Sequence, residues 1–507
     1  MRPSDRSNLA LQFLSTFVIG SLAACSDSGS TSAVLSDAGA LAVDASVDAS
    51  TVQDAGTSTD SDASSLPDSS TDAGAPYATT VVARPLSVTG HDRLNNVAYD
   101  PQGRIVAVGQ SCPGVAATDD CASVIVRMLA DGTLDASFGT GGVVTKNFAV
   151  GASGEVARGL AIVAGKIVVA AAGEQAGASD ARERDVYLAR FNDDGSIDST
   201  FGTNGVATFN LAPGVLVGST FKTDSQWGLA ADATGRLYVS GAAVAPGRND
   251  TDFAVLRTTI DGARDTSFGV NGVFTLDIAN ADGAGRALLV GPSGVVTACG
   301  YMTDASSNAI VPVVYRTTPA GVLDATFASA GVFAEGVLPA QAEAYALALQ
   351  GDRVVTNGYG RAATSEELDF VSLRLSSAGA LDTTFGTAGV VRIDANGFKD
   401  QGRALAVLAD HRVLLVGAGR STATNADGLL ALLSENGGAD TAFGLKGQRL
   451  VDLGGTNDTL NAVAVAPSGK RAVAVGTRAF VQPAADAGTD AGVVQGDDGA
   501  LVLVSLP

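Results

Sequence analysis

A stretch of twelve residues that recurs along the chain constrains its fold more than any other feature. The stretch reads LDASFGTGGVVT at residues 134–145, and later copies keep its Asp and its Phe at fixed offsets. Those copies begin at Ile197, Arg264, Leu323, Leu381 and Ala439. A spacing of about 60 residues is too long for one rung of a β-solenoid and fits one multistranded unit per repeat. The repetition predicts architecture first, so a specific function should lie in what differs between copies.

Each unit holds four short apolar segments with the character of strands. In the fifth unit they read YALALQ, RVVTNG, DFVSLRLS and AGVVRID, between residues 345 and 394. Val and Leu dominate these segments, whereas Gly, Asp and Ser gather in the connections. Four strands in about sixty residues predict one small antiparallel sheet per unit.

The second of these segments occurs once more than the twelve-residue motif does. It marks seven units, at residues 104–109, 166–171, 236–241, 294–300, 353–358, 412–417 and 470–476. The seventh unit ends without a fourth strand, while a spare strand, YATTVVARPL at 77–86, precedes the first unit. If the spare strand completes the last sheet, the units close into a ring without exposed sheet edges. We therefore predict an all-β, seven-bladed β-propeller of four-stranded antiparallel blades over residues 77–507, with a linear stack as the alternative.

The residues of the motif are predicted to be structural. The Asp suits a turn in which its carboxylate accepts backbone N–H groups, and an Arg eight residues earlier in five copies is expected to pair with it. The Phe should wedge between neighbouring blades, where full burial contributes roughly 1.5–3 kcal/mol. The six pairs are Asp135 and Phe138, Asp198 and Phe201, Asp265 and Phe268, Asp324 and Phe327, Asp382 and Phe385, and Asp440 and Phe443.

The beginning of the chain has the features of an export signal. Two arginines precede an apolar run at 9–19, and the segment LAAC follows and ends at Cys25. LAAC resembles the bacterial lipobox, in which cleavage precedes the Cys and the thiol is lipidated; a plain secretory signal is the alternative. We predict a signal peptide over 1–24, a lipid anchor to the membrane at Cys25 and, because Ser26 is not Asp, an outer-membrane or cell-surface location.

Two segments have a composition that does not support a packed core. Residues 25–76 consist mostly of Ser, Ala, Asp, Thr and Gly, and we expect a disordered linker there. A similar run, VQPAADAGTDAGVVQGDDG at 481–499, interrupts the last unit and is expected to be a mobile loop.

The core of the motif, xG-x-LD-xx-FG-xx-G inside a four-strand unit, resembles the delta-60 repeat of exported proteins and lipoproteins of delta-class proteobacteria. The resemblance covers roughly residues 78–507. It implies a β-propeller-like repeat domain on an exported protein, without any established reaction or catalytic residue. The chain departs from the pattern at Ala328, where Gly is usual, at Ala439, where Leu is usual, and in the seventh unit, which lacks the motif. We expect these units to pack more loosely.

Charge and composition exclude some classes of partner. The net charge of -21 argues against a nucleic-acid partner, because phosphate binding needs clustered Lys and Arg. The acidic segment NDDGSID at 192–198 begins like a calcium loop, but the other copies lose its acids. We therefore expect neither a bound metal nor a cofactor.

A few residues outside the motif could contribute to a site. Cys112 and Cys121 lie in one loop and are expected to form a disulfide in an oxidising compartment, whereas Cys299 is expected to be a buried hydrophobic residue. The lone Trp227 could stack on a sugar or anchor a partner, although a core position is favoured. Neither His91 nor His411 has ligand or triad partners at the required spacing.

Two classes of function remain. In a propeller, the loops between second and third strands and those between blades share one face, and their variation predicts a recognition surface there. The first hypothesis is a monomeric, membrane-anchored scaffold that binds a protein, peptide or glycan through this loop face. The alternative is an envelope hydrolase or lyase with its active site at the propeller channel. The shortage of His and the lack of a non-repeated polar cluster favour the scaffold, and we predict no enzymatic activity.

Overall fold

The computed structural model describes residues 77–86, 90–114, 120–148, 155–175, 178–180, 182–483 and 493–507. The regular structure in these ranges consists of β-strands. Nowhere in them is there a helix of the length and apolarity that a membrane crossing requires. The predicted signal peptide, the lipidation site at Cys25 and the linker up to residue 76 lie outside the described residues.

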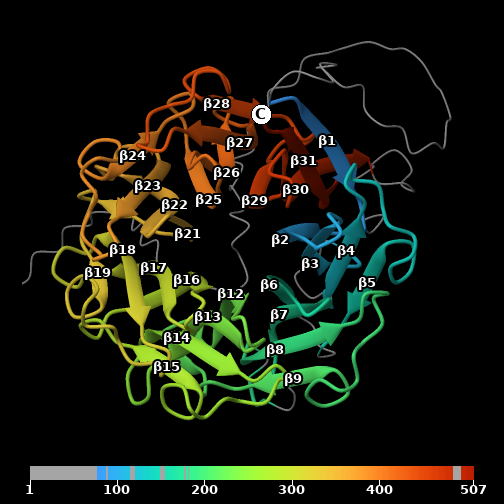
Figure 1. The fold of residues 1–507 in the computed structure, drawn as a ribbon, viewed down its shortest axis with the longest axis vertical. Coiled ribbons are helices and arrows are strands. Elements are labelled where there is room, and N and C mark those ends of the chain that lie inside the picture. Colours follow the sequence, from blue (N-terminus) through green and yellow to red (C-terminus); the bar gives the residue numbers. More distant parts are fainter. Residues whose placement is uncertain are drawn as a thin grey trace, which may run out of the picture.

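The strands form antiparallel sheets that follow one another along the chain, and Figure 1 shows these sheets arranged around a common centre. One sheet holds β2 (Asp92–Tyr99), β3 (Ile105–Ser111), β4 (Ala122–Met128) and β5 (Val143–Lys146). The next holds β6 (Val156–Val163), β7 (Lys166–Glu174), β8 (Arg184–Phe191) and β9 (Val206–Phe209). After the hairpin of β10 (Val215–Val217) and β11 (Thr220–Lys222) comes the sheet of β12 (Ser225–Ala231), β13 (Leu237–Val244), β14 (Thr251–Thr258) and β15 (Val273–Leu276).

Two of the expected four-stranded units are joined into one nine-stranded sheet. The first contributes β16 (Gly283–Val290), β17 (Val296–Thr303), β18 (Ile310–Thr317) and β19 (Val332–Ala334). The second contributes β21 (Ala346–Gln350), β22 (Arg353–Arg361), β23 (Asp369–Leu375) and β24 (Val390–Ile393). The short strand β20 (Gln341–Ala342) joins them, because it pairs in parallel with β18 and antiparallel with β22.

The last units bring the two ends of the described chain together. One sheet holds β25 (Asp400–Val407), β26 (Val413–Arg420), β27 (Ala426–Leu433) and β28 (Gln448–Val451). The other holds β29 (Thr459–Val465), β30 (Arg471–Pro483), β31 (Val493–Ser505) and β1 (Thr79–Arg84). In it, β1 pairs antiparallel with β31 over six residues, from Thr79 opposite Val504 to Arg84 opposite Gly499. The prediction of an all-β chain with four-stranded antiparallel sheets is confirmed, except that β20 joins two of the units into one sheet.

The expected mobile loop at 481–499 is partly wrong. Strands β30 and β31 stay paired out to Pro483 opposite Val493, well inside the Asp/Ala/Gly-rich run. An antiparallel ladder is held by backbone hydrogen bonds, so a composition without apolar side chains does not prevent it. The central part of this run, residues 484–492, lies outside the described residues.

Hydrophobic cores lie between neighbouring sheets. Strands in the middle of a sheet are covered on both faces, which is why β8, β14 and β27 are buried along their whole length. A typical core joins side chains of one sheet with those of the next, as in the cluster of Val168, Leu188, Phe201, Leu237, Val239 and Leu256. Buried contact between adjacent sheets thus connects consecutive units of the chain.

The twelve-residue motif lies at these junctions. All six of its Phe side chains are 0% exposed. In the third copy, the N–H of Gly269 after Phe268 donates to the carbonyl of Ala320 in the following sheet at 2.9 Å. Gly321 then approaches the Phe268 ring so closely that a Cβ would lie 2.8 Å from it, and its φ is +72°. Both conditions exclude larger residues, which explains the repeated Gly.

The motif Arg binds the Asp of its own unit and also reaches the next sheet. In five copies the Arg Nε lies 2.8–2.9 Å from the Asp Oδ2. The same guanidinium donates through Nη1 to a backbone carbonyl of the next sheet. In the sixth copy Leu432 replaces the Arg, and Arg412 binds Asp440 instead, at 2.9 Å. Phe327 beside Ala328 and Phe443 of this sixth copy are as fully buried as the others, so the departures from the pattern do not expose the motif Phe.

Candidate functional site

One position of the repeat carries side chains of different chemistry in different units, whereas the twelve-residue motif is nearly uniform. The first strand of each unit lies nearest the centre in Figure 1, and most of these strands contain a register shift that leaves one residue out of the ladder. In β16 the shift spans two residues, Arg286 and Ala287, and in the unit of β21 the corresponding Tyr345 lies between β20 and β21. The residues at this position are Asn95, Arg158, Trp227, Arg286, Tyr345, Arg403 and Asn461. A β-bulge re-aims a side chain, so the same device presents different chemistry in each unit.

Five of these residues come together, and we call Arg158, Trp227, Arg286, Tyr345 and Arg403 the central cluster. The Cζ atoms of Arg158 and Arg286 lie 4.2 and 3.8 Å from the centroid of the Trp227 ring. The Cζ atoms of Arg286 and Arg403 lie 4.7 and 4.8 Å from the Tyr345 ring. Trp227 and Tyr345 meet edge to face, with centroids 5.6 Å apart. Aromatic rings therefore hold three guanidinium groups beside one another.

The central cluster is partly accessible to solvent. Arg158, Trp227, Tyr345 and Arg403 are half-buried, and Arg286 is 7% exposed. The cluster is extended by Tyr301 and Tyr359 near the ends of β17 and β22, where the second strands lead into the loop face. It therefore belongs to the half of the centre that adjoins the loop face.

The charge of the central cluster is opposite to that of the chain. Three arginines gather here in a protein of net charge -21. Glu343 lies beside one of them, with its Oε2 4.0 Å from Nη2 of Arg286. The expectation that the chain lacks a non-repeated polar cluster is wrong.

The remaining two residues at this position, Asn95 and Asn461, have a structural role. Asn461 Nδ2 donates to the carbonyl of Leu94 at 3.0 Å, and Asn95 Nδ2 donates to that of Ala157 at 3.1 Å. Each Asn thus joins its own first strand to the first strand of a neighbouring sheet.

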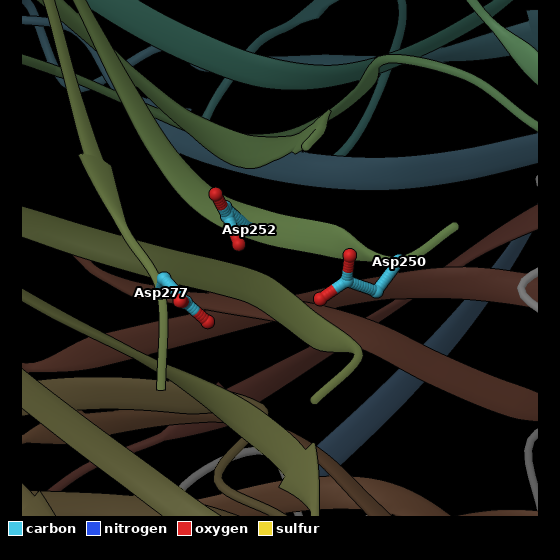
Figure 2. A group of neighbouring side chains, drawn as sticks. All are labelled: Asp250, Asp252 and Asp277. Carbon is cyan, nitrogen blue, oxygen red and sulfur yellow. The ribbon is translucent and has the colours of Figure 1, made fainter. Parts of the chain in front are cut away.

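Acidic residues form a second kind of cluster, separate from the central cluster. Figure 2 shows one of these groups, in which Asp250, Asp252 and Asp277 approach from β14 and the segments beside it. In each group one carboxylate oxygen per residue lies within 4.8 Å of the others. The two further groups consist of Asp369, Asp394 and Asp400, and of Asp427, Asp452 and Asp458.

The sequence-predicted residues lie mostly away from the central cluster. The structure pairs Cys112 with Cys121 in a disulfide and leaves Cys299 as a buried thiol, whose burial raises its pKa to about 12. Trp227 is not in a hydrophobic core, because it lies between arginines of the central cluster. His91 does have a partner, since its Nδ1 lies 3.0 Å from Asp497 Oδ2.

A signal for the central position was present in the sequence. An acidic residue stands three positions before the bulged one in five units, as Asp92, Glu155, Asp224, Asp400 and Asp458. Most of these carboxylates cap the preceding connection; Asp400 Oδ2, for example, accepts the N–H of Ala395 at 2.7 Å. Aligning the units on this acid would have shown the variable position that follows it.

Comparison with known proteins supports the fold. A family model described as a domain of unknown function (DUF5122) β-propeller matches residues 165–201. No curated protein is close enough in sequence to count as a relative. The chain is an all-β protein with a β-propeller fold.

Similar solved structures include a periplasmic gluconolactonase of Pseudomonas aeruginosa, with 14% identity over 82% of this chain and 99% of that one, at a TM-score of 0.39. Sqt1 of Chaetomium thermophilum, bound to the N-terminus of ribosomal protein L10, has 12% identity over 84% and 100% of the two chains, with a TM-score of 0.38. The endosialidase of phage phi92 has 7% identity over 86% and 72%, with a TM-score of 0.42.

Proposed function

We propose that the protein is an exported, lipid-anchored recognition scaffold that binds an anionic ligand at the central cluster. The observation that carries this proposal is the gathering of Arg158, Arg286 and Arg403 on two aromatic rings, in a chain that is otherwise acidic. Guanidinium groups bind carboxylates and phosphates through planar, charge-assisted hydrogen bonds. Rings that fix the guanidinium planes reduce the entropy that ligand binding would otherwise cost.

The proposed scaffold is a closed ring of seven blades, with β1 as the fourth strand of the last blade. Support comes from the pairing of β1 with β31 and from the contact of Asn461 with Leu94 between the last and first units. Arg84 of β1 also donates to the carbonyl of Gly132 in the first unit, much as the motif Arg does elsewhere. A closed ring would hold the five residues of the central cluster in fixed relative positions.

The proposed location is the outer membrane or cell surface, with the delta-60 type domain attached through Cys25 and the linker to residue 76. The lipobox-like LAAC segment supports export and lipidation. The disulfide between Cys112 and Cys121 is consistent with an oxidising compartment. A monomer anchored in this way would expose its loop face to ligands outside the cytoplasm.

Binding fits the central cluster better than turnover does. An Arg side chain stays protonated at all relevant pH values, so three arginines can hold an anion but cannot act as a general base. The nearby Glu343 is buried and lies beside Arg286, an arrangement that neutralises charge. We therefore propose a binding protein and not a hydrolase or lyase.

The test is calorimetric titration of the full mature chain with an oligogalacturonide, with inorganic phosphate and with a neutral oligosaccharide of the same length. We expect the carboxylated sugar or phosphate to bind and the neutral sugar not to bind. Arg403→Gln should weaken binding at least about tenfold, because one charge-assisted contact is worth about 1.4 kcal/mol or more.

Arg182→Gln is the matched control, since it removes the same charge from a side chain that is 48% exposed and pairs locally with Asp180. It should bind like the wild type. Equal affinity for neutral and acidic sugars, or equal losses in the two variants, would refute the proposal.

A further inference from the structure

The acidic group of Asp427, Asp452 and Asp458 lies on the loop-face side, where two sheets meet. Asp427 belongs to β27, Asp452 follows β28, and Asp458 directly precedes β29 of the next sheet. Their carboxylate oxygens approach to within 4.8 Å of one another. Three carboxylates this close repel one another strongly unless positive charge or protons compensate them.

The chain contains two related groups in which a guanidinium supplies that compensation. In the group of Figure 2, Arg248 contacts all three carboxylates, with 2.9 Å to both Asp250 and Asp277 and a short contact to Asp252. In the group of Asp369, Asp394 and Asp400, Arg392 lies 2.6 Å from Asp369. In both groups, the compensating cation is an arginine side chain of the protein itself.

The third group has lost this cation. The position of Arg392, seven residues after the motif Phe, is Leu450 in the following unit. Among the described residues, no Lys, Arg or His forms an ion pair with Asp427, Asp452 or Asp458. The polar hydrogens that reach Asp427 and Asp452 come from Asn425 Nδ2 at 2.8 Å and from the N–H of Gly454 at 2.7 Å.

A buried oxygen points to a missing ligand. Asp458 is 1% exposed; its Oδ2 accepts the N–H groups of Leu453 and Gly455, whereas its Oδ1 is buried without a hydrogen-bond partner. An unsatisfied carboxylate oxygen is rare in proteins and is commonly explained by a bound ion or water.

We propose that Asp427, Asp452 and Asp458 bind a calcium ion at this junction. Only oxygen atoms are offered, which excludes the N and S ligands that zinc prefers and fits a hard cation. Calcium accepts irregular sets of six to eight oxygens, so water and backbone carbonyls can complete its shell. Magnesium requires a near-ideal octahedron and gives up its water reluctantly, so it should bind more weakly. This site is independent of anion binding at the central cluster.

The experiment is calorimetric titration of the EDTA-treated, desalted full mature chain with CaCl₂ and, separately, with MgCl₂. We expect calcium to bind with a Kd on the order of 10⁻⁴–10⁻³ M, the range of extracellular calcium modules, and magnesium to bind at least about tenfold more weakly. Asp452→Asn should weaken calcium binding at least about tenfold. Asp452 is exposed, so this variant should unfold in urea like the EDTA-treated wild type.

Asp277→Asn is the matched control because Asp277 holds the same repeat position in the group that Arg248 already neutralises. It should bind calcium like the wild type. The proposal is overturned if the wild type does not bind calcium, if Asp452→Asn binds it unchanged, or if Asp277→Asn loses binding equally. Equal affinity for magnesium would overturn the choice of metal.

Discussion

The outer junctions and the centre of this molecule use the same repeat in opposite ways. At the junctions, the motif Phe is 0% exposed in all six copies and the Arg–Asp pair forms in five, with Arg412 substituting in the sixth. At the centre, one bulged position carries Asn, Arg, Trp or Tyr, depending on the unit. Repetition therefore holds the sheets together, and variation at a single position creates a site that no unit possesses alone.

This difference separates stability from recognition. Changing a junction residue should lower the free energy of unfolding, because the side chain is buried between two sheets. Changing a half-buried residue of the central cluster should alter ligand binding and leave the unfolding free energy nearly unchanged. The predictions below test this separation.

The largest effect is expected from deleting residues 77–84, which removes β1. The last sheet would lose its fourth strand, and β31 would be left with an unpaired edge. We expect the single cooperative urea transition to be lost or to move to much lower urea. An unchanged transition midpoint and slope would mean that the pairing of β1 with β31 does not stabilise the protein.

Replacing a junction Phe by Ala should lower the free energy of unfolding by less than deleting a whole strand does, but still by a large fraction. Phe268→Ala removes a side chain that is 0% exposed, and we expect a loss of about 3–5 kcal/mol in urea unfolding. Phe148→Ala is the comparison, because Phe148 is half-buried and stacks on Tyr187 at 5.3 Å. Equal losses in the two variants would remove the special role of the motif Phe.

The acids near the centre should make stability depend on pH. Burial raises the pKa of Asp224, Asp400 and Asp458 to about 7, so between about pH 4 and 7 each is protonated when folded and ionised when unfolded. Their destabilising effect is complete above pH 7 and fades as the pH falls toward 4. The junction Asp198 behaves oppositely, since hydrogen bonding by Thr200 lowers its pKa to about 2, and its stabilisation is lost only below about pH 4.

In EDTA, the urea midpoint should therefore be higher at about pH 5 than at about pH 8. Asp224→Asn should reduce this difference, because the amide does not titrate. If the midpoint rose with pH over this range, the raised pKa values of these buried carboxyl groups would be wrong.

The smallest effect is expected at the tip of a motif turn. Val270 is 78% exposed, and Val270→Ser should change the free energy of unfolding by no more than about 0.5 kcal/mol. A larger loss would show that the turn tip, and not only the buried part of the motif, stabilises the junction.

The sequence was sufficient for the features that the repeat itself encodes. Spacing and residue type predict the repeat period and the number of strands per unit. They also predict the burial of Phe268 and the partner of Asp382, because each of these depends on only one or two adjacent units. The central cluster could not be predicted in this way. Trp227 and Tyr345 touch although they lie in different units, and nothing in local periodicity shows that their strands are innermost or bulged at that residue.

The acidic groups were also missed, for a related reason. Calcium was sought in the turn NDDGSID, where ligands would follow one another in sequence. Asp427, Asp452 and Asp458 come from three different segments, so only the arrangement of strands brings their carboxylates together.

The most direct test compares two variants that each remove one guanidinium, Arg374→Gln at a junction and Arg403→Gln at the centre. Urea unfolding and oligogalacturonide binding are measured for both. Arg374 is 0% exposed and bonded to Asp382, so its loss should cost about 3 kcal/mol or more. Arg403→Gln should unfold within about 0.5 kcal/mol of the wild type and bind the acidic sugar at least about tenfold more weakly. The opposite pattern, with binding intact and stability reduced in Arg403→Gln, would contradict the assignment of recognition to the centre.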